Sequence, residues 1–204
     1  MCSTMNARDF FYRHDQLVIF DTEFTTWEGA MERGWSGDYE HREIVQIAAQ
    51  KIDLKNEAVI ESFERLVRPQ VNPDLSQYFQ ELTGITQVAV DEHGVDFTTM
   101  YTEFSRWADG LTKYAYGKRV HEPADVAVLQ ENIALYELDL TLDTTEYGNL
   151  AAVYQSVGID TSAYSSGELY RAFGLELDGH VHNAMHDVTS LVESLFATKR
   201  ILLA

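Results

Sequence analysis

The strongest pattern in the chain is an apolar run at residues 17–20 that leads directly into Asp21-Thr22-Glu23. The run is β-branched and aromatic, which is typical of a strand buried on both faces. Alternate side chains of a strand point the same way, so this pattern places Asp21 and Glu23 on one face. The two carboxylates repel each other, and the next basic residue is Arg33. A bound divalent cation with oxygen ligands is the simplest compensation, and an acidic pair solvated in a loop is the alternative.

The rest of the chain alternates between strand and helix patterns. Residues 43–49 and 60–67 predict two further strands, and the polar turn at Asn56 between them indicates an antiparallel hairpin. Residues 111–117 predict a fourth strand. Helices are expected over residues 74–81, 97–107 (capped by Asp96), 123–129, 147–157, 165–173 (opened by a capping box of Ser165 and Glu168) and from 182 to about 200. This order indicates an α/β fold in which helices flank a mixed central β-sheet.

Two segments lack a regular pattern of this kind. Residues 1–15 are mixed and polar, so we expect a poorly ordered N-terminal arm, followed by a single domain over residues 16–204. Residues 25–42 are rich in glycine and charge and predict a long loop, a length that is uncommon unless the segment is functional or mobile. Trp27 and Trp35 in this loop have two interpretations: they stack on bases or sugars, or they cover an edge of the core.

Composition narrows the class of protein. The 204 residues, 45% of them hydrophobic, suit one globular domain with a substantial core. No apolar run approaches the roughly 20 residues that a membrane span requires, and the N-terminus lacks the apolar stretch of a secretory signal. The single cysteine, Cys2, excludes an intramolecular disulfide framework and a thiolate metal cluster. Together these features predict a cytoplasmic protein without a membrane partner.

The net charge of -18, from 33 acidic and 15 basic residues, limits the kinds of binding partner to be expected. Proteins that wrap long nucleic acid usually present a basic surface, because neutralising phosphates supplies much of their affinity. If this chain acts on nucleic acid, we expect it to hold a short piece or one end, with metal ions supplying the positive charge. The alternative is that the acidity only keeps the protein soluble.

A second group of chemically active residues lies near the C-terminus, at 182–187. His182 and His186 are four residues apart and would suit a zinc pair on one helical face, although no cysteine is at hand as a further ligand. In the other interpretation, Asp187 joins the carboxylates of the first strand as a hard oxygen ligand, and His182 stands beside the site as a base. Asp125 taken alone is an ordinary acid in the first turn of a helix, where the helix dipole favours it.

These groups match, in order, the three motifs of the DEDDh 3′-5′ exonucleases, which are also called DnaQ-like or RNase-T-like exonucleases. Asp21-Thr22-Glu23 resembles the first motif, Asp125 with Leu129 the second, and His182 with Ala184 and Asp187 the third. The resemblance runs over about residues 17–198 and includes the segments 43–47 and 81–86. Within the family the chain is most similar to the enhanced-RNAi and bacterial sporulation-inhibitor-like branch, on the basis of residues 82–87, Val90-Asp91 and Phe97.

The resemblance implies an RNase-H-like fold and a metal-dependent 3′-5′ exonuclease. Its substrates would be single-stranded RNA or DNA ends or short oligonucleotides, with some preference for RNA, and its products nucleoside 5′-monophosphates. By the same resemblance, Asp21, Glu23 and Asp187 hold two Mg2+ or Mn2+ ions. Asp125 contributes directly or through water, and His182 takes a proton from the attacking water. Homodimers are frequent among relatives, so a homodimer is a possible assembly.

The resemblance also implies contacts with the substrate. Phe24 and Thr25 would line the terminal nucleotide, while Leu82 and Ile85 would wedge against its base. Plain core packing is the alternative for Leu82 and Ile85.

Three features depart from the family's pattern. The stretch between Gly117 and Asp125 is longer than usual, which bears on where Asp125 lies. Gln46 stands where many relatives carry an acid. His186 precedes Asp187 where relatives often have an acid or a small residue, and we expect it to point elsewhere on the helix. Two other functions stay open: a phosphodiesterase for small cyclic or modified dinucleotides, and a non-catalytic binding module for nucleic acid or protein that keeps the fold.

Overall fold

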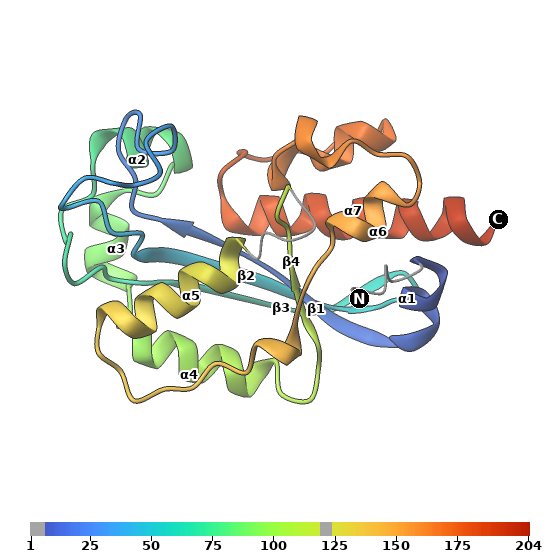
Figure 1. Cartoon of the computed structure of the whole chain (residues 1–204), viewed down its shortest axis with the longest axis horizontal. Helices are drawn as coiled ribbons and strands as arrows, with labels where there is room; N and C mark the ends of the chain where they lie inside the picture. The colour runs from blue at the N-terminus through green and yellow to red at the C-terminus, as the bar shows by residue number, and fades with distance from the viewer. Residues whose placement is uncertain (1–6, 119–123) are drawn as a thin grey trace.

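The computed structural model describes residues 7–118 and 124–204 of the chain (Figure 1). Within them, five strands form one mixed sheet in the order β3-β2-β1-β4-β5. The strands are β1 Gln16–Phe24, β2 Ile44–Asp53, β3 Ala58–Leu66, β4 Lys113–Ala115 and β5 Tyr147–Asn149. This arrangement confirms the α/β fold with a mixed central sheet.

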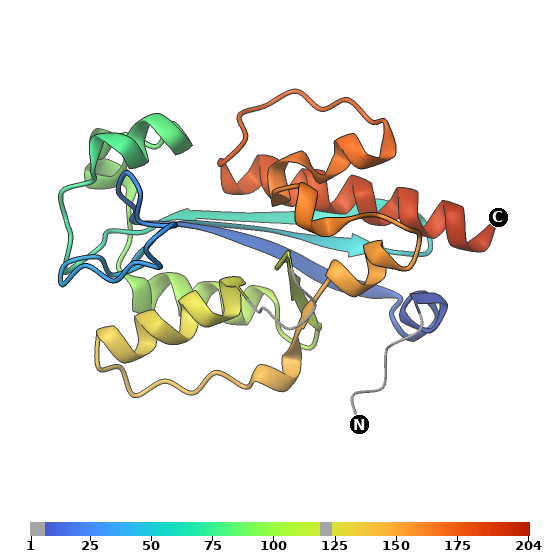
Figure 2. The ribbon, with the colours of Figure 1, turned by 45° about the horizontal axis from the view of Figure 1, so that its top comes forward.

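Helices cover both faces of the sheet. The α-helices are α1 Ala7–Arg13, α2 Gln77–Thr83, α3 Gln87–His93, α4 Phe97–Trp107, α5 Ala124–Leu135, α6 Ala151–Gln155 and α7 Ala184–Leu203. Three short 3₁₀ helices are η1 Thr144–Glu146, η2 Thr161–Ala163 and η3 Ser166–Phe173. Figure 2 shows α7 along one face, α4 and α5 on the opposite face, and α2 and α3 grouped at one end.

The long strands form an antiparallel ladder that brings distant polar residues into one row. Glu23 of β1 pairs with Gln46 of β2, which pairs in turn with Leu66 of β3. The backbone N–H of Asn56 donates to the Asp53 carboxylate at 2.9 Å and closes the turn between β2 and β3, so the hairpin is confirmed. On the other side of β1, β4 and β5 add in parallel.

The residues of β1 alternate between two hydrophobic cores. Leu17 and Ile19 pack on the side of α7, whereas Val18 and Phe20 pack on the side of α4 and α5, and all four are fully buried. The predicted burial of this strand on both faces is therefore confirmed. Because side chains alternate along a strand, Asp21 continues the α7 side, just beyond the end of the apolar run.

The expectation of a poorly ordered arm is wrong for residues 7–15, and residues 1–6 lie outside the described part of the chain. Residues 7–13 form α1, whose Phe10 and Phe11 are buried in the core on the α7 side. The Phe10 ring lies 5.2 Å from that of Tyr114, centroid to centroid. Two aromatic side chains supply enough apolar surface to hold this short helix against the sheet, although the surrounding sequence is polar.

The structure also differs from the sequence-based expectation of a helix over residues 147–157. Tyr147–Asn149 instead forms β5, and Gly148 pairs with Tyr114 of β4. Only from Ala151 does the chain become helical, as α6. Pairing with a sheet edge has overridden the local helical pattern. The strand predicted over 111–117 is confirmed only as the three residues of β4, and the expected helix start at Pro123 lies outside the described residues, with α5 present from Ala124.

Two smaller differences concern helix type and helix starts. The segment after Ser165 forms the 3₁₀ helix η3, and the Ser165 hydroxyl donates to the Glu168 carboxylate at 3.1 Å instead of accepting a backbone N–H. A helix that the sequence analysis did not predict, α3, begins after Thr86, whose hydroxyl accepts from the N–H of Ala89. The predicted Asp96 cap of α4 is confirmed, since its carboxylate accepts from the N–H of Thr99 at 2.8 Å.

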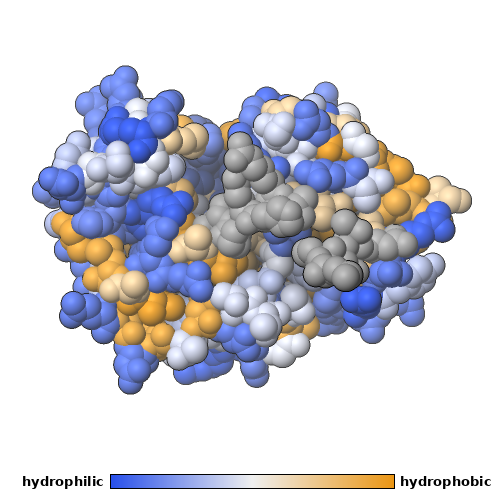
Figure 3. All heavy atoms as spheres, in the orientation of Figure 1, coloured by the Kyte–Doolittle hydropathy of each residue, from blue (hydrophilic) through white to orange (hydrophobic). Residues whose placement is uncertain are grey.

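The last helix carries the apolar stripe that the sequence predicts. Val188, Leu191 and Leu195 are fully buried, whereas Ile201 and Leu203 at the far end are exposed. Figure 3 shows hydrophobic side chains gathered over this C-terminal end of α7 and at the lower left of the view, over the α4 and α5 region. In residues 7–118 and 124–204, none of the helices combines the length and the apolar character needed to cross a membrane.

The packing of α1 predicts that two aromatic residues of the same helix contribute very differently to the free energy of unfolding. Phe10→Ala should lower the free energy of unfolding by about 3–5 kcal/mol, because it leaves a cavity under a fully buried ring. Tyr12→Ala, at a side chain that is 77% exposed, should change it by less than about 0.5 kcal/mol. Urea unfolding of both variants measures this. An unfolding midpoint of Phe10→Ala equal to that of the unmodified protein would show that α1 is not part of the folded domain.

Candidate active site

The end of β1 places two carboxylates under the beginning of α7. Asp21 and Glu23 lie two residues apart on one face, opposite Ala48 and Gln46 of β2. Both side chains are buried, with exposed fractions of 6% for Asp21 and 9% for Glu23. They do not form an acidic pair solvated in a loop, which was the alternative interpretation of this segment.

The first turn of α7 brings a third carboxylate. Asn183 caps the helix by accepting the N–H groups of Met185 and His186, and Asp187 lies in the first turn, 1% exposed. The Ser166 hydroxyl donates to Asp187 Oδ2 at 2.8 Å. The backbone N–H of His182 donates to Asp187 Oδ1 at 3.2 Å. The carboxylate is therefore held in a fixed orientation toward the sheet.

His182 lies before the helix, not on it as the sequence analysis expects. It precedes the cap and adopts a left-handed backbone conformation, with φ of 70°, which is uncommon for a residue other than glycine. Its ring is half-buried, and one ring nitrogen and one carboxylate oxygen each of Glu23 and Asp187 lie within 4.8 Å of one another. A strained backbone at such a position is typical of functional sites.

The His186 ring is held by η3 and is not part of the group formed by Glu23, His182 and Asp187. The ring is buried, Nε2 lies 3.1 Å from the carbonyl oxygen of Gly167, and the ring packs edge-on against Tyr170. The zinc pair of His182 and His186 is therefore wrong, and the expectation that His186 points elsewhere is confirmed. A Cβ at Gly179 would collide with the His186 ring, so a side chain at that position would displace it.

The fourth carboxylate, Asp125, reaches the site from α5. It is 5% exposed, and its Oδ1 accepts two hydrogen bonds from Thr22: one from the backbone N–H at 3.1 Å and one from the hydroxyl at 2.7 Å. The middle residue of the first motif thus holds the second motif in place. The long stretch before Asp125 does not prevent this placement, although residues 119–123 lie outside the described part of the chain.

Burial and mutual repulsion raise the pKa values of this cluster. Burial raises the pKa of Asp21 well above its ordinary value, and the charges of three neighbouring carboxylates raise it further. Burial, followed by the charges of Asp187 and Asp125, also raises the pKa of Glu23. Burial raises the pKa of Asp125 to about 6, although the hydrogen bonds from Thr22 act in the opposite direction. Burial likewise raises the pKa of Asp187 against the hydrogen bond from Ser166.

This set of donors fits a divalent metal ion. Carboxylate oxygens are the ligands that hard cations prefer, and a cation would offset the repulsion that raises these pKa values. The geometry of Glu23, His182 and Asp187 already brings three donor atoms together. The structure therefore contains a candidate metal site at the end of β1.

Sequence reasoning missed the residues that support the carboxylates from a distance. Ser166 and Gly167 come from η3, and a Cβ at Gly167 would collide with the carboxylate of Asp187. Thr22 is visible in the motif, but its contact with Asp125 spans 103 residues. The one signal in the sequence was the small or hydroxyl character of these positions, which is compatible with many surface turns.

Of the four residues expected to contact a terminal nucleotide, Phe24 is the last residue of β1 and Thr25 follows it. Phe24 is half-buried; its ring lies 5.6 Å from that of Trp35 and 5.5 Å from the Arg42 guanidinium. Thr25 is buried, and its hydroxyl donates to the carbonyl of His41 and accepts the N–H of Glu43. Its hydroxyl thus holds the two ends of the 25–42 loop together.

The other two come from the segment after α2. Leu82 is half-buried, and its carbonyl accepts a hydrogen bond from His180 Nε2 at 3.0 Å. Ile85 is 6% exposed and packs in a small core with Phe79 and Val90. Ile85 therefore packs in a core, as its alternative interpretation held. Leu82 lies beside the loop that leads to His182.

The tryptophans of the 25–42 loop pack against aromatic neighbours. Trp35 contacts Phe24, and the ring of Trp27 lies 5.3 Å from that of Tyr39, centroid to centroid. Both tryptophans are half-buried. These contacts agree with the interpretation in which the tryptophans cover an edge of the core.

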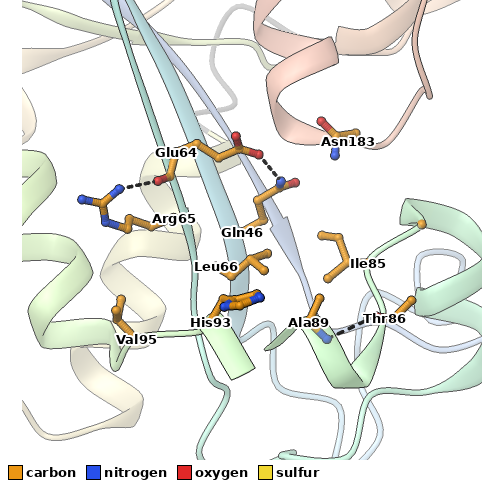
Figure 4. Close-up of a pocket in the computed structure, with 11 residues that line it drawn as sticks. Gln46, Glu64, Arg65, Leu66, Ile85, Thr86, Ala89, His93, Val95 and Asn183 are labelled. Atoms are coloured by element: carbon orange, nitrogen blue, oxygen red, sulfur yellow. Dashed lines mark hydrogen bonds between the residues drawn. The ribbon is translucent and has the colours of Figure 1, made fainter. Parts of the chain in front are cut away.

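A cavity of about 630 Å3 opens between β3, the α2–α3 region and Asn183 (Figure 4). We call it the β3 pocket. Its lining includes Gln46, Glu64 and Leu66 from the sheet, Ile85 and Ala89 from the α2–α3 region, and Asn183 before α7.

The chain matches one family model over most of its length. The model RNase_T, described as "Exonuclease", matches residues 18–195. ERI1 exoribonuclease 2 of Xenopus laevis is 33% identical over 111 residues, which is 54% of this chain and 15% of that protein. The 3′-5′ exonuclease eri1 of Schizosaccharomyces pombe is 38% identical over 90 residues, 44% of this chain and 28% of that protein. The matched part is thus less than a third of each of these relatives.

Solved structures show the same fold. The nuclease domain of 3′hExo, a DEDDh family member bound to rAMP, aligns with a TM-score of 0.73 at 20% identity, over 93% of this chain and 92% of that one. A 3′-exonuclease that recognises a histone mRNA stem-loop aligns with a TM-score of 0.74 at 19% identity, over 90% and 63%. These likenesses confirm the RNase-H-like fold. The family match shows that the chain belongs to the RNase_T family of exonucleases, and it is similar over part of its length to exonucleases named ERI1.

Proposed function

We propose that this protein is a metal-dependent 3′-5′ exonuclease that releases nucleoside 5′-monophosphates from single-stranded RNA or DNA ends or from short oligonucleotides. The observation that carries the proposal is the meeting of four buried carboxylates with His182 at the end of β1. Membership in an exonuclease family supports the reaction. The names of the relatives as exoribonucleases favour RNA.

The carboxylates have the chemistry of metal ligands. Asp21, Glu23 and Asp187 would hold two Mg2+ or Mn2+ ions, with Asp125 contributing directly or through water. Such ions, when bound, stabilise the charge of both the attacking and the leaving oxygens in an in-line phosphoryl displacement. The hydroxyls of Thr22 and Ser166 donate to Asp125 and Asp187, and an ionised carboxylate that accepts such hydrogen bonds keeps further oxygen lone pairs for a metal ion.

His182 is suited to act as the general base. Its ring lies beside Glu23 and Asp187, half-buried, and a histidine can take up a proton near neutral pH. We propose that it takes the proton of the water that attacks the terminal phosphate. The bond to the 3′ oxygen of the preceding nucleotide then breaks, and the terminal nucleotide leaves with its 5′ phosphate.

The terminal nucleotide would lie between two walls of the site. We propose that Phe24 and Thr25 line it from the end of β1, and that Leu82 and Ile85 wedge against its base. Phe24 and Leu82 are half-buried and can present apolar surface, whereas Thr25 and Ile85 are buried. The net charge of -18 supports contact with only a short stretch of substrate. Cytoplasmic location and a homodimer are part of the same proposal.

The proposed reaction predicts which residues are needed on a labelled oligonucleotide. With 5′-labelled single-stranded RNA or DNA and Mn2+ or Mg2+, a gel should show shortening from the 3′ end, and chelator should abolish it. Asp21→Ala and His182→Ala should each slow the reaction by at least roughly 100-fold. Asp109→Ala, at an exposed carboxylate after α4, should leave it unchanged. Intact oligonucleotides with every metal would overturn the exonuclease, and small dinucleotides would then be the next substrates to test.

The raised pKa values predict how metal-free protein responds to pH. Because these groups hold their protons more tightly in the folded state, they stabilise the fold below about pH 4. That contribution is lost as the pH rises through the pKa of about 6 for Asp125 and through the raised pKa values of Asp21 and Glu23. The melting temperature in chelator should therefore fall from about pH 5 to about pH 8. Mn2+ should raise the melting temperature more at the higher pH.

Asp21→Asn tests whether repulsion within the carboxylate cluster, and not the net charge of the whole chain, destabilises the metal-free protein. The variant should melt higher than the unmodified protein in chelator at about pH 8, because one crowded charge is gone, and it should gain less from Mn2+. Equal melting temperatures with and without Mn2+ in the unmodified protein would count against the metal site.

The contact between Thr22 and Asp125 predicts a graded effect. Thr22→Val keeps the shape but removes the hydroxyl that donates to Asp125 Oδ1. It should lower Mn2+ affinity or activity by roughly 10–100-fold, whereas Thr22→Ser, which keeps the donor, should stay close to the unmodified protein. Mn2+ titration by thermal shift and the oligonucleotide assay measure both. Equal behaviour of the two variants would mean that the hydroxyl does not position Asp125.

A further inference from the structure

Gln46 lies on β2 and lines the β3 pocket (Figure 4). It is 3% exposed, and it pairs across the sheet with Glu23. Its side-chain oxygen accepts the backbone N–H of Ala184 at 3.0 Å. Its side-chain nitrogen donates to the carboxylate of Glu64 on β3 at 2.8 Å. One buried amide thus connects three elements: β2, β3 and the start of α7.

The bond to Ala184 fixes the end of α7 that carries the proposed catalytic groups. The first N–H groups of a helix have no partner within the helix. Asn183 accepts those of Met185 and His186, and Gln46 accepts that of Ala184, the first residue of the helix. His182 lies two residues before this bond and Asp187 three residues after it.

Glu64 determines which way the Gln46 amide points. A carboxylate can only accept hydrogen bonds, and the N–H of Ala184 can only donate. The amide satisfies both partners in one orientation, with its nitrogen toward Glu64 and its oxygen toward Ala184. The opposite orientation would place two donors together and two acceptors together.

We propose that Gln46 is a positioning residue that sets α7, and with it His182 and Asp187, against Glu23, and that Glu64 holds its amide in the required orientation. The inference rests on the proposed exonuclease function for its kinetic consequence. Its structural part, that Gln46 fixes the position of α7 on β2, depends only on the two hydrogen bonds of the Gln46 side chain. Gln46 itself takes no part in the chemistry.

Gln50 provides a matched control on the same strand and the same face. It also lies under α7, one helical turn further along, and it is 7% exposed. Its side-chain nitrogen lies 3.7 Å from Met185 Sδ and 3.5 Å from Thr189 Oγ1. Its contacts are with side chains in the first two turns of α7, whereas Gln46 binds the backbone at the first residue. If packing under α7 were all that mattered, the two glutamines would be equivalent.

The first test compares Gln46→Leu with Gln50→Leu in the full chain. We expect amide hydrogen exchange at Ala184 to become faster in Gln46→Leu and to stay unchanged in Gln50→Leu. We also expect Gln46→Leu to lower kcat on a single-stranded oligonucleotide by roughly 10–100-fold with little change in KM, because small displacements of catalytic groups slow the chemical step. Gln50→Leu should keep kcat within about twofold.

The second test exchanges the two polar partners. Gln46→Glu places a carboxylate against Glu64, and it should lower kcat by roughly tenfold or more. Glu64→Gln alone should have an effect below about threefold, because a glutamine oxygen can still accept from Gln46. In the double variant the new glutamine donates to the new glutamate, whose other oxygen accepts from Ala184, so most of the loss should be recovered.

The two readouts keep this inference separate from the proposed function. Unchanged exchange at Ala184 in Gln46→Leu would overturn the seating of α7, whether or not the protein degrades oligonucleotides. Equal loss of kcat in Gln46→Leu and Gln50→Leu would reduce the effect to packing and overturn the positioning role. A double variant as slow as Gln46→Glu would overturn the part assigned to Glu64. If the unmodified protein cleaves nothing while Ala184 exchange responds as expected, the proposed function fails and the seating of α7 stands.

Discussion

The confinement of four carboxylates in one buried place is the constraint on which the rest of the structure depends. Asp21, Glu23, Asp125 and Asp187 are all at least nine-tenths buried, and burial raises the pKa of each; repulsion from neighbouring carboxylates raises the pKa values of Asp21, Glu23 and Asp125 further. An isolated protein gains no stability from such an arrangement, because each negative charge disfavours the next. The cluster is a feature that function requires and that the surrounding fold must tolerate, and its repulsion is also what gives a divalent cation its affinity for the site.

The fold maintains this cluster by attaching each carboxylate to a rigid element and supporting it from a second one. Asp21 and Glu23 belong to the central strand, which is packed on both faces. Asp125 on α5 is fixed by Thr22 of that strand, and Asp187 on α7 is fixed by Ser166 of η3. Hydrogen bonds that donate to a carboxylate favour its charged form, so these supports partly offset the repulsion while they set the orientation. The same hydrogen bonds therefore orient the carboxylates and reduce the cost of their repulsion.

Local patterns predicted the parts of this arrangement that neighbouring residues determine. The apolar run before Asp21, the hairpin at Asn56 and the cap at Asp96 are confirmed, because each depends on a few adjacent residues. The family motifs located the carboxylates and His182. The strand β5 and the burial of α1 were not predicted, because they arise from contacts with distant elements, β4 and the sheet core. The pairing of Ser166 with Asp187 is invisible in sequence for the same reason. The place of His182 before α7 was missed because the cap at Asn183 starts the helix after it.

The charge of the molecule makes the binding of metal and of substrate interdependent. A net charge of -18 and a site built of carboxylates both repel a phosphodiester. Arg42, the cation stacked on Phe24 and Trp35, is paired with Glu131 and so brings little net positive charge. Without bound cations the proposed site would exclude its own substrate. If cations raise the affinity for a nucleic-acid end, the end must raise the affinity for cations by the same factor. An acidic exonuclease of this kind would therefore assemble its complete site only on the end of a strand, because the attraction is confined to the few ångströms around the ions.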